Sequence, residues 1–426
     1  MALRMNKRHT FTVLAGAVSV ALVAAACGGG GGGGNAAASS GADARGPITY
    51  VQGKDNSNLL APQAARWNAA HPTEKVTIKE QSDQADQQHD DLVQNFQAKS
   101  TAYDVVSVDV VWTAEFAAKG WLTPLKDKFA LPTTGFLAPT IKAATYNNTL
   151  YAAPTSSDGA MLYYRSDLVK TPPKTFDEMW SMCSIAKQNG MDCYAGQFAK
   201  YEGGTCNATE WMNAYGAKVV DDAGKPTVDS PEAAAGLKAL ADHYKNGDIP
   251  KQAITYQEEQ SRAAFQDGKL LFLRNWPYVY NLASTDASSK VKGKFAVAPL
   301  PGVDGPGTST LGGHMAAISA FSKNKATALD FLKFLTSPEE QKTNMEKGSL
   351  APVIESIYTD QALVAKYPYL PTLKESISNA VSRPVTPFYP AVSKAIQENF
   401  YAAIQGQKTP EAAVKDMQAA MQAASG

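Results

Sequence analysis

The feature that most constrains the fold is the alternation of short apolar segments with segments of helical periodicity after residue 47. Strand-like segments at 48–51, 76–80 and 103–109 are separated by helix-like segments at 60–70 and 83–99. Strands and helices that alternate at this spacing indicate an α/β fold, because each helix lets the next strand run parallel to the last. The third segment is almost wholly apolar, which indicates a strand that is covered on both faces.

The same alternation continues to the C-terminus. We expect further helices at 175–187, in much of 210–266 and after residue 320, and further strands at 150–154, 161–164, 270–273, 295–298 and 316–319. The 426 residues are too many for one hydrophobic core, so the length predicts two domains.

The N-terminus has the pattern of a secretory signal peptide. Basic side chains at Arg4, Lys7 and Arg8 precede an apolar run at 11–26, which is short for a membrane-spanning helix. Cys27 follows three alanines directly. This arrangement resembles the lipobox of a bacterial lipoprotein, in which the cysteine is lipidated and becomes the first residue of the mature chain.

The lipobox is imperfect, because Ala24 stands where a large aliphatic residue is usual. The alternative is an ordinary secretory signal with an accidental cysteine. We predict a signal peptide at 1–26 and a lipid-anchored, glycine-rich flexible tether at 27–46. The remainder would then lie on the extracytoplasmic face of the cell membrane, anchored through Cys27.

Charge excludes some partners. The chain has 40 basic and 40 acidic residues and no basic tract, which argues against nucleic-acid binding. No second apolar run approaches membrane-spanning length.

Three cysteines remain after Cys27, so one disulfide and one free thiol is the simplest arrangement in an oxidising compartment. We favour Cys183–Cys193, since these residues bracket a helix end, Gly190 and a strand start. Their spacing is not that of zinc ligands and no histidine lies near, so we expect no metal ion there and no cofactor.

Further signals are spread in order across nearly all of the predicted mature chain, in the segments 103–112, 116–125, 154–168, 200–203, 274–278, 298–301, 311–319 and 383–390. Together these segments resemble the carbohydrate-binding lipoproteins of bacterial ABC importers, and in particular those of the maltose/trehalose type.

The resemblance implies a two-lobed, periplasmic-binding-protein-like fold of type II with a sugar in the cleft between the lobes. Lobe one would comprise 47–154 and 312–352, and lobe two would comprise 155–311 and 353–426. The chain would cross between the lobes near Pro154, Gly312 and Pro352.

A sugar site needs carboxylates or amides for hydroxyl groups and aromatic rings for the C–H faces. Asp109 ends a buried strand, where α/β sheets bind ligands, although it could instead cap a helix at Thr113. Asp158 precedes Gly159, a common turn pair, so a turn role competes with sugar binding. The resemblance favours binding for both aspartates. We also expect Tyr201 and Glu202, in a loop before two glycines, to contact the sugar.

Trp276 and Tyr278 follow a buried strand, and their spacing by two puts both rings on one side of an extended segment. Core packing is the alternative for these rings. Arg383, held extended before Pro384, has a guanidinium that can donate to adjacent hydroxyls. A surface ion pair is its alternative.

Two positions depart from the family pattern. Gly313 is followed by His314, where several relatives carry a stacking tryptophan, so the sugar at that subsite would differ or bind more weakly. Asn56 lies in a segment that lacks the acidic residue of the family, and we assign it to the site on position alone.

We therefore expect a non-enzymatic receptor, monomeric by default, that binds a disaccharide-like sugar and delivers it to membrane permease subunits. The competing interpretation is a secreted glycosidase, which also needs paired carboxylates. Asp109, Asp158 and Glu202 are its candidates. The sequence has no nucleophile elbow, metalloprotease motif or phosphate loop.

Overall fold

The computed structural model describes residues 44–221 and 223–425. The predicted signal peptide, Cys27 and most of the predicted tether lie outside these residues. Within them, no helix is both long enough and apolar enough to cross a bilayer.

The first sheet has five strands and is mixed. Its strand order is β2 (Val76–Glu80), β1 (Ile48–Gln52), β3 (Val105–Asp109), β13 (His314–Ile318) and β6 (Ala152–Pro154). The strands β1, β2 and β3 are parallel, as predicted, but β13 runs antiparallel to both β3 and β6. The alternation near the N-terminus could not predict β13 as a neighbour of β3, because some 200 residues separate the two strands.

Both faces of this sheet are covered, as the apolar third strand predicts. On one face, Val105 belongs to a cluster with Trp67 of α1 (Leu60–Ala70) and Phe331 of α11 (Lys325–Leu335). On the other face, Val106 and Val108 belong to the larger core cluster, which also contains Phe96 of α2 (Ala85–Gln97) and Phe116 of α3 (Thr113–Ala118). Packing on both faces of the sheet thus holds the carboxyl end of β3, where Asp109 lies, rigidly in place.

The second sheet has four strands, in the order β11 (Ala296–Ala298), β8 (Met161–Tyr164), β10 (Leu270–Asn275) and β9 (Asp192–Ala195). All six residues of β10 are buried. Alongside this sheet, α7 (Glu202–Ala214) stacks Trp211 on Phe176 of α5 (Phe176–Ser181), with ring centroids 4.0 Å apart.

A short ladder lies where the chain passes between the two sheets. It pairs β7 (Asp158–Gly159), which follows β6, with β12 (Leu311–Gly312), which precedes β13. The Ser157 N–H also donates to the Ala351 carbonyl, 3.0 Å away, after α12 (Pro338–Gly348). Three chain segments therefore lie together at the passage.

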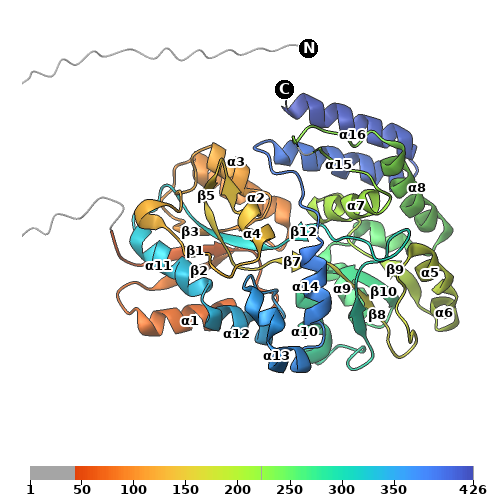
Figure 1. Ribbon diagram of the computed structural model, residues 1–426, viewed down its shortest axis with the longest axis horizontal. Helices are drawn as coiled ribbons and strands as arrows, with labels where there is room; N and C mark the ends of the chain where they lie inside the picture. The colour runs from red at the N-terminus through yellow and green to blue at the C-terminus, as the bar shows by residue number, and fades with distance from the viewer. Residues whose placement is uncertain (1–43, 222, 426) are drawn as a thin grey trace, which may run out of the picture. The chain divides into compact units, whose positions relative to one another are not determined.

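The C-terminal helices lie beside elements of the second sheet's part of the molecule. α14 (Leu370–Ser378) contacts β7 and β8, whereas α15 (Tyr389–Ile404) and α16 (Pro410–Ser425) lie beside α7 and α8 (Pro231–Asn246). Figure 1 shows α15 and α16 in blue next to the green α7 and α8. The remaining elements are β4 (Thr145–Tyr146), β5 (Thr149–Leu150), α4 (Ala138–Ala143), α6 (Cys183–Gln188), α9 (Glu258–Gln266), α10 (Tyr278–Thr285), α13 (Gln361–Lys366) and three 3₁₀ turns, η1 (Asp127–Phe129), η2 (Lys251–Thr255) and η3 (Glu355–Thr359).

The predicted helix at 175–187 begins as its sequence indicates. Thr175 and Glu178 form a capping box, with each side chain accepting from the other residue's backbone N–H. The helix is not continuous, however, because Met182 separates α5 from α6.

The structure joins Cys183 to Cys193, the pair that the sequence favours, and leaves Cys206 as a buried free thiol among the described residues. The disulfide connects α6 to β9, at the outer edge of the second sheet.

Replacing Cys183 and Cys193 together by serine should lower the free energy of unfolding by about 2–3 kcal/mol, because a loop of about ten residues would no longer be closed in the unfolded chain. Urea unfolding of the variant and of the unreduced protein would measure this difference. Thiol titration of an unreduced, unfolded chain that starts after Cys27 should find one thiol, and three would contradict the pairing.

Candidate functional site

A cavity of about 260 Å³ lies beside the ladder of β7 and β12. This volume is just below the range of about 300–1,000 Å³ that is common for ligand sites. Residues of the first sheet's part, such as Gln52 and Asp109, line it together with residues of the second sheet's part, such as Glu258 and Trp276. A molecule bound here would touch both parts.

Nine of the ten predicted ligand contacts line this cavity: Asn56, Asp109, Asp158, Glu202, Trp276, Tyr278, Gly313, His314 and Arg383. They come from segments that lie up to 327 residues apart in the chain, from Asn56 to Arg383, so only the fold brings them together.

Tyr201 is the exception. It occupies the N-cap position of α7, and its hydroxyl donates to Glu258 of α9 at 2.7 Å. Glu258 lines the cavity and Tyr201 does not. The structure therefore places Tyr201 behind the cavity wall, where it supports a neighbouring carboxylate.

Asp109 lies at the carboxyl end of β3, opposite His314 of β13. Its carboxylate accepts from the Val111 N–H at 3.2 Å, whereas the N-cap of α3 is Trp112 and has no side-chain cap. The alternative that Asp109 caps this helix is thus wrong.

Arg383 links the two parts of the molecule. Its side chain is 2% exposed and donates to Asp109 of β3 at 2.8 Å and, through the other terminal nitrogen, to Glu202 of α7. The alternative for Arg383 was a surface ion pair. Arg383 does form ion pairs, but its guanidinium is buried, so the surface location is wrong. Both terminal nitrogens are already bound to carboxylates, and the buried Nε is unpaired.

Glu202 is the first residue of α7, so the loop predicted at 201–202 is wrong at this position. Besides Arg383, the hydroxyls of Tyr389 and Ser393 donate to its carboxylate. Burial raises the pKa of Glu202, as does the negative charge of Asp109, while Arg383 and the two hydroxyls oppose the shift. The network holds this carboxylate in one position.

Asp158 lies in the two-residue strand β7 and not in the predicted turn. Among the described residues, no group donates a hydrogen bond to its carboxylate, and it lines the cavity. Burial, together with the charge of Asp109, raises the pKa of Asp158 from 3.8 to about 6, against the opposing effect of His314 and Arg274. An acceptor without a donor is available to a ligand hydroxyl.

Trp276 and Tyr278 both line the cavity, although the segment between them is not extended. Pro277 is helical and α10 begins at Tyr278. The Tyr278 hydroxyl donates to Glu259 at 2.6 Å, so its ring is fixed. Trp276 packs partly against the core, as the alternative to ligand binding predicts, and it also lines the cavity.

Gly313 and His314 lie where β12 leads into β13. Gly313 has φ +117°, and a Cβ atom there would lie 2.3 Å from the Ser156 carbonyl oxygen, so a side chain does not fit. This backbone conformation directs His314 toward the cavity. His314 is one of the positions at which the sequence departs from the family pattern.

Sequence reasoning missed several polar residues of the cavity wall. Glu258 and Glu259 begin α9, and the side chain of Gln260 closes a capping box with Gln257. The sequence signal for these residues was the acidic start of a helix. That signal does not predict that α9 packs beside β10 and therefore faces Trp276. Further polar wall residues are Gln52, Lys54, Asp55, Gln63, Asp83, Gln88 and Asn344.

The wall combines carboxylates and amides with the aromatic rings of Tyr50, Trp276 and Tyr278, a set that can accept from and donate to hydroxyl groups and cover apolar C–H faces. Within the described part of the chain, no group of three histidine, cysteine or acidic side chains is arranged to hold a metal ion. The wall therefore suits a polar organic molecule.

Comparison with known proteins identifies the class. The profile of the bacterial extracellular solute-binding proteins matches residues 51–342, and the chain belongs to this family. It is 33% identical over 341 residues to a probable ABC transporter-binding protein of Deinococcus radiodurans, covering 76% of this chain and 80% of that protein. It is 26% identical over 295 residues to a maltotriose-binding protein of Pyrococcus abyssi, covering 67% and 62%.

Solved structures agree with the two-lobed α/β fold that the sequence predicts. The maltose-bound MalE3 of T. maritima superposes with a TM-score of 0.84 and 35% identity, covering 88% of this chain and 99% of that one. A solute-binding protein of Thermotoga lettingae, bound to α-D-tagatose, superposes with a TM-score of 0.81 and 26% identity over 89% of this chain and 100% of that one. The fold is therefore that of a two-lobed periplasmic binding protein.

The raised pKa of Asp158 makes a pH-dependent prediction. The folded protein holds this proton up to about pH 6, whereas the unfolded chain releases it near 3.8. Stability from the neutral carboxyl is complete below pH 3.8 and lost as the pH rises through 6. Asp158→Asn should therefore be more stable than the wild type at pH 7.5, by about 1–3 kcal/mol, with the gap closing at low pH.

Urea unfolding of both proteins at pH 4.5 and 7.5 would measure the gap. The exposed Asp304, changed to asparagine, is the control and should show no such difference. A gap for Asp158→Asn that does not depend on pH would contradict this assignment.

Proposed function

We propose that this protein is the extracytoplasmic sugar-binding receptor of an ABC importer. In this proposal the two lobes close on a disaccharide-like carbohydrate of the maltose or trehalose type, and the closed receptor delivers it to permease subunits in the membrane. The ligand stabilises the closed state because it contacts both lobes only in that state.

The observation that carries the proposal is the composition of the cavity wall. Asp109, at the end of β3, and Asp158, in β7 of the ladder, both line the cavity with carboxylates, and Trp276 lines it with an aromatic ring from the second lobe. A sugar ring needs both kinds of group, hydrogen-bond acceptors at its rim and an apolar surface at its face.

The disaccharide class has support from the relatives. The Pyrococcus abyssi relative is named for maltotriose and the MalE3 structure holds maltose, whereas the Thermotoga lettingae structure holds tagatose. We therefore propose a ligand of two sugar rings, without assigning a linkage.

Three further parts of the proposal concern the whole chain. Lobe one comprises 47–154 and 312–352, and lobe two comprises 155–311 and 353–426. The receptor acts as a monomer and is anchored to the membrane through lipidated Cys27. The strand arrangement supports the lobe limits, because β6 and β13 lie in the first sheet and β8 in the second.

A thermal-shift screen of the purified protein against maltose, trehalose and monosaccharides tests the proposal. A sugar at about a hundred times its dissociation constant should add about 2.7 kcal/mol to the free energy of unfolding. The sugar should be recovered intact. Release of glucose from the sugar would instead support the glycosidase, and no shift with any sugar would contradict sugar binding.

Trp276→Ala should weaken binding of the sugar found by this screen by tenfold or more, because burial of a ring face contributes about 1–3 kcal/mol. Calorimetric titration would measure the loss. Trp180 is a matched control, since it is also half-buried in the second sheet's part but stacks on His243 away from the cavity. Trp180→Ala should leave the affinity unchanged, and an equal loss in both variants would remove Trp276 from the site.

A further inference from the structure

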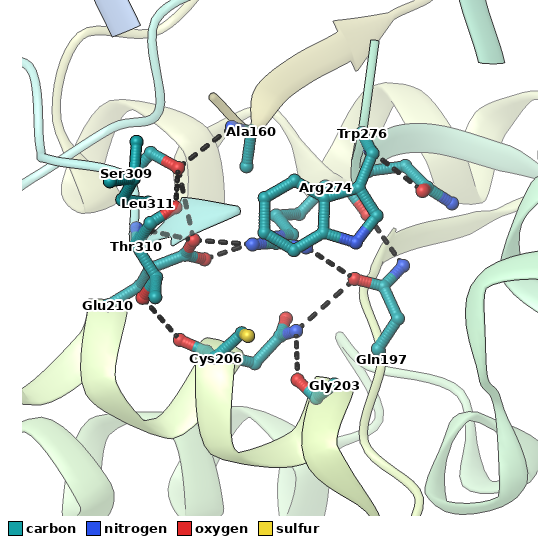
Figure 2. A network of polar contacts seen from close by, with 12 residues as sticks. Ala160, Gln197, Gly203, Cys206, Glu210, Arg274, Trp276, Ser309, Thr310 and Leu311 are labelled. Carbon is teal, nitrogen blue, oxygen red and sulfur yellow. Dashed lines mark hydrogen bonds and ion pairs between the residues drawn. The ribbon is translucent and has the colours of Figure 1, made fainter. Parts of the chain in front are cut away.

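One face of the Trp276 indole is covered by a charged group. The guanidinium carbon of Arg274 lies 3.9 Å from the centre of the indole ring, although Arg274 itself does not line the cavity. Arg274 is 1% exposed. Figure 2 shows its guanidinium directly behind the ring. The indole thus has one face against Arg274, which leaves the opposite face for a ligand.

Arg274 is held so that its plane cannot rotate. Its Nε donates to one carboxylate oxygen of Glu210 at 2.8 Å, and Nη2 donates to the other. Its Nη1 donates to the Gln197 side-chain oxygen at 2.8 Å. A two-point contact with a carboxylate fixes the orientation of a guanidinium, which a lysine ammonium cannot reproduce.

Glu210 also binds the chain at the passage between the lobes. The Thr310 N–H donates to its carboxylate at 3.0 Å, and Thr310 directly precedes β12 of the ladder. The same carboxylate therefore holds both the guanidinium behind Trp276 and the segment that leads to Gly312.

Gly312 restrains the edge of the ring. A Cβ atom on Gly312 would lie 3.0 Å from Cζ3 and 3.1 Å from Cη2 of the indole, tighter than ordinary contacts. The backbone of Trp276 is fixed as well, since its N–H donates to Asn275 at 2.7 Å and its carbonyl accepts from the Tyr163 hydroxyl at 2.8 Å. The ring is bounded at its back, at one edge and along its backbone.

We propose that Arg274, oriented by Glu210, is a positioning residue that fixes the plane of Trp276 as a stacking surface for a sugar ring. The proposal rests on the sugar-binding function proposed above and adds the reason why the ring is in place before the ligand arrives. An aromatic surface that is already oriented loses no rotamer freedom on binding, so more of its contact free energy appears as affinity.

A buried ion pair is weak evidence for a role in stability, because its desolvation cost offsets much of its attraction. The position of a charged pair directly behind one aromatic ring is therefore better explained by orientation. Contact between a planar cation and an aromatic face also gives the ring a preferred distance and tilt.

Arg274→Lys tests the proposal, because lysine keeps the positive charge for Glu210 and removes the planar group behind the ring. We expect the affinity for maltose, measured by calorimetry, to fall about tenfold. We also expect loss of the near-UV circular dichroism band of Trp276, identified as the difference between the wild type and Trp276→Phe. This second readout needs no ligand.

Arg165→Lys is the matched control. Arg165 makes the same two-point contact with Asp167, at 2.8 and 2.6 Å, immediately after β8 of the same sheet, and it does not line the cavity. It should keep both the affinity and the band. A merely structural role for Arg274 would lower the unfolding temperature without changing the band.

Gly312→Ala provides an independent variant if Arg274→Lys does not fold. It leaves the pair of Arg274 and Glu210 intact and should displace the ring edge, weakening maltose binding and altering the Trp276 band. A folded Arg274→Lys that keeps the band would overturn the proposal. An altered band in Gly312→Ala with unchanged maltose affinity would also overturn it, because the position of the ring would then not matter for binding. If the wild type binds no sugar, the proposed function fails, and the band alone still decides the role of Arg274.

Discussion

The ion pairs of Arg383 join the two lobes in the wall of the cavity. One guanidinium lies between Asp109, at the end of a first-sheet strand, and Glu202, at the start of a second-lobe helix. Without it, the buried carboxylate of Glu202 and the partly buried carboxylate of Asp109 would have no cation between them, and breaking a buried ion pair typically costs about 3–5 kcal/mol. The relative position of the two halves of the cavity depends on this contact.

The same contact changes the role that the sequence suggests for Arg383. A guanidinium whose terminal nitrogens already bind carboxylates has little left to donate to a sugar. Asp158, by contrast, lines the cavity without a donor among the described residues, and the Trp276 ring lines the cavity and has Arg274 behind it. The structure thus separates residues that hold the lobes together from residues that are available to a ligand.

The sequence predicts local elements well because their signals are local. Apolar periodicity predicts β1 to β3 and α1 closely, and the Thr175 box predicts the start of α5. Contacts between residues that lie far apart in the chain leave no such local signal in the sequence. Tyr201 turns to Glu258, and Arg274 lies behind Trp276, only because α7, α9 and β10 pack together. Aromatic and acidic residues that are close in the sequence can either line a cavity or lie behind its wall, and the sequence pattern does not distinguish these two places.

The most direct test of this account is small-angle X-ray scattering of the wild type and of Arg383→Met, each without sugar. If Arg383 holds the lobes together across the cleft, the variant should have the larger radius of gyration, because the carboxylates of Asp109 and Glu202 then repel each other. Equal radii in the two sugar-free proteins would contradict the account.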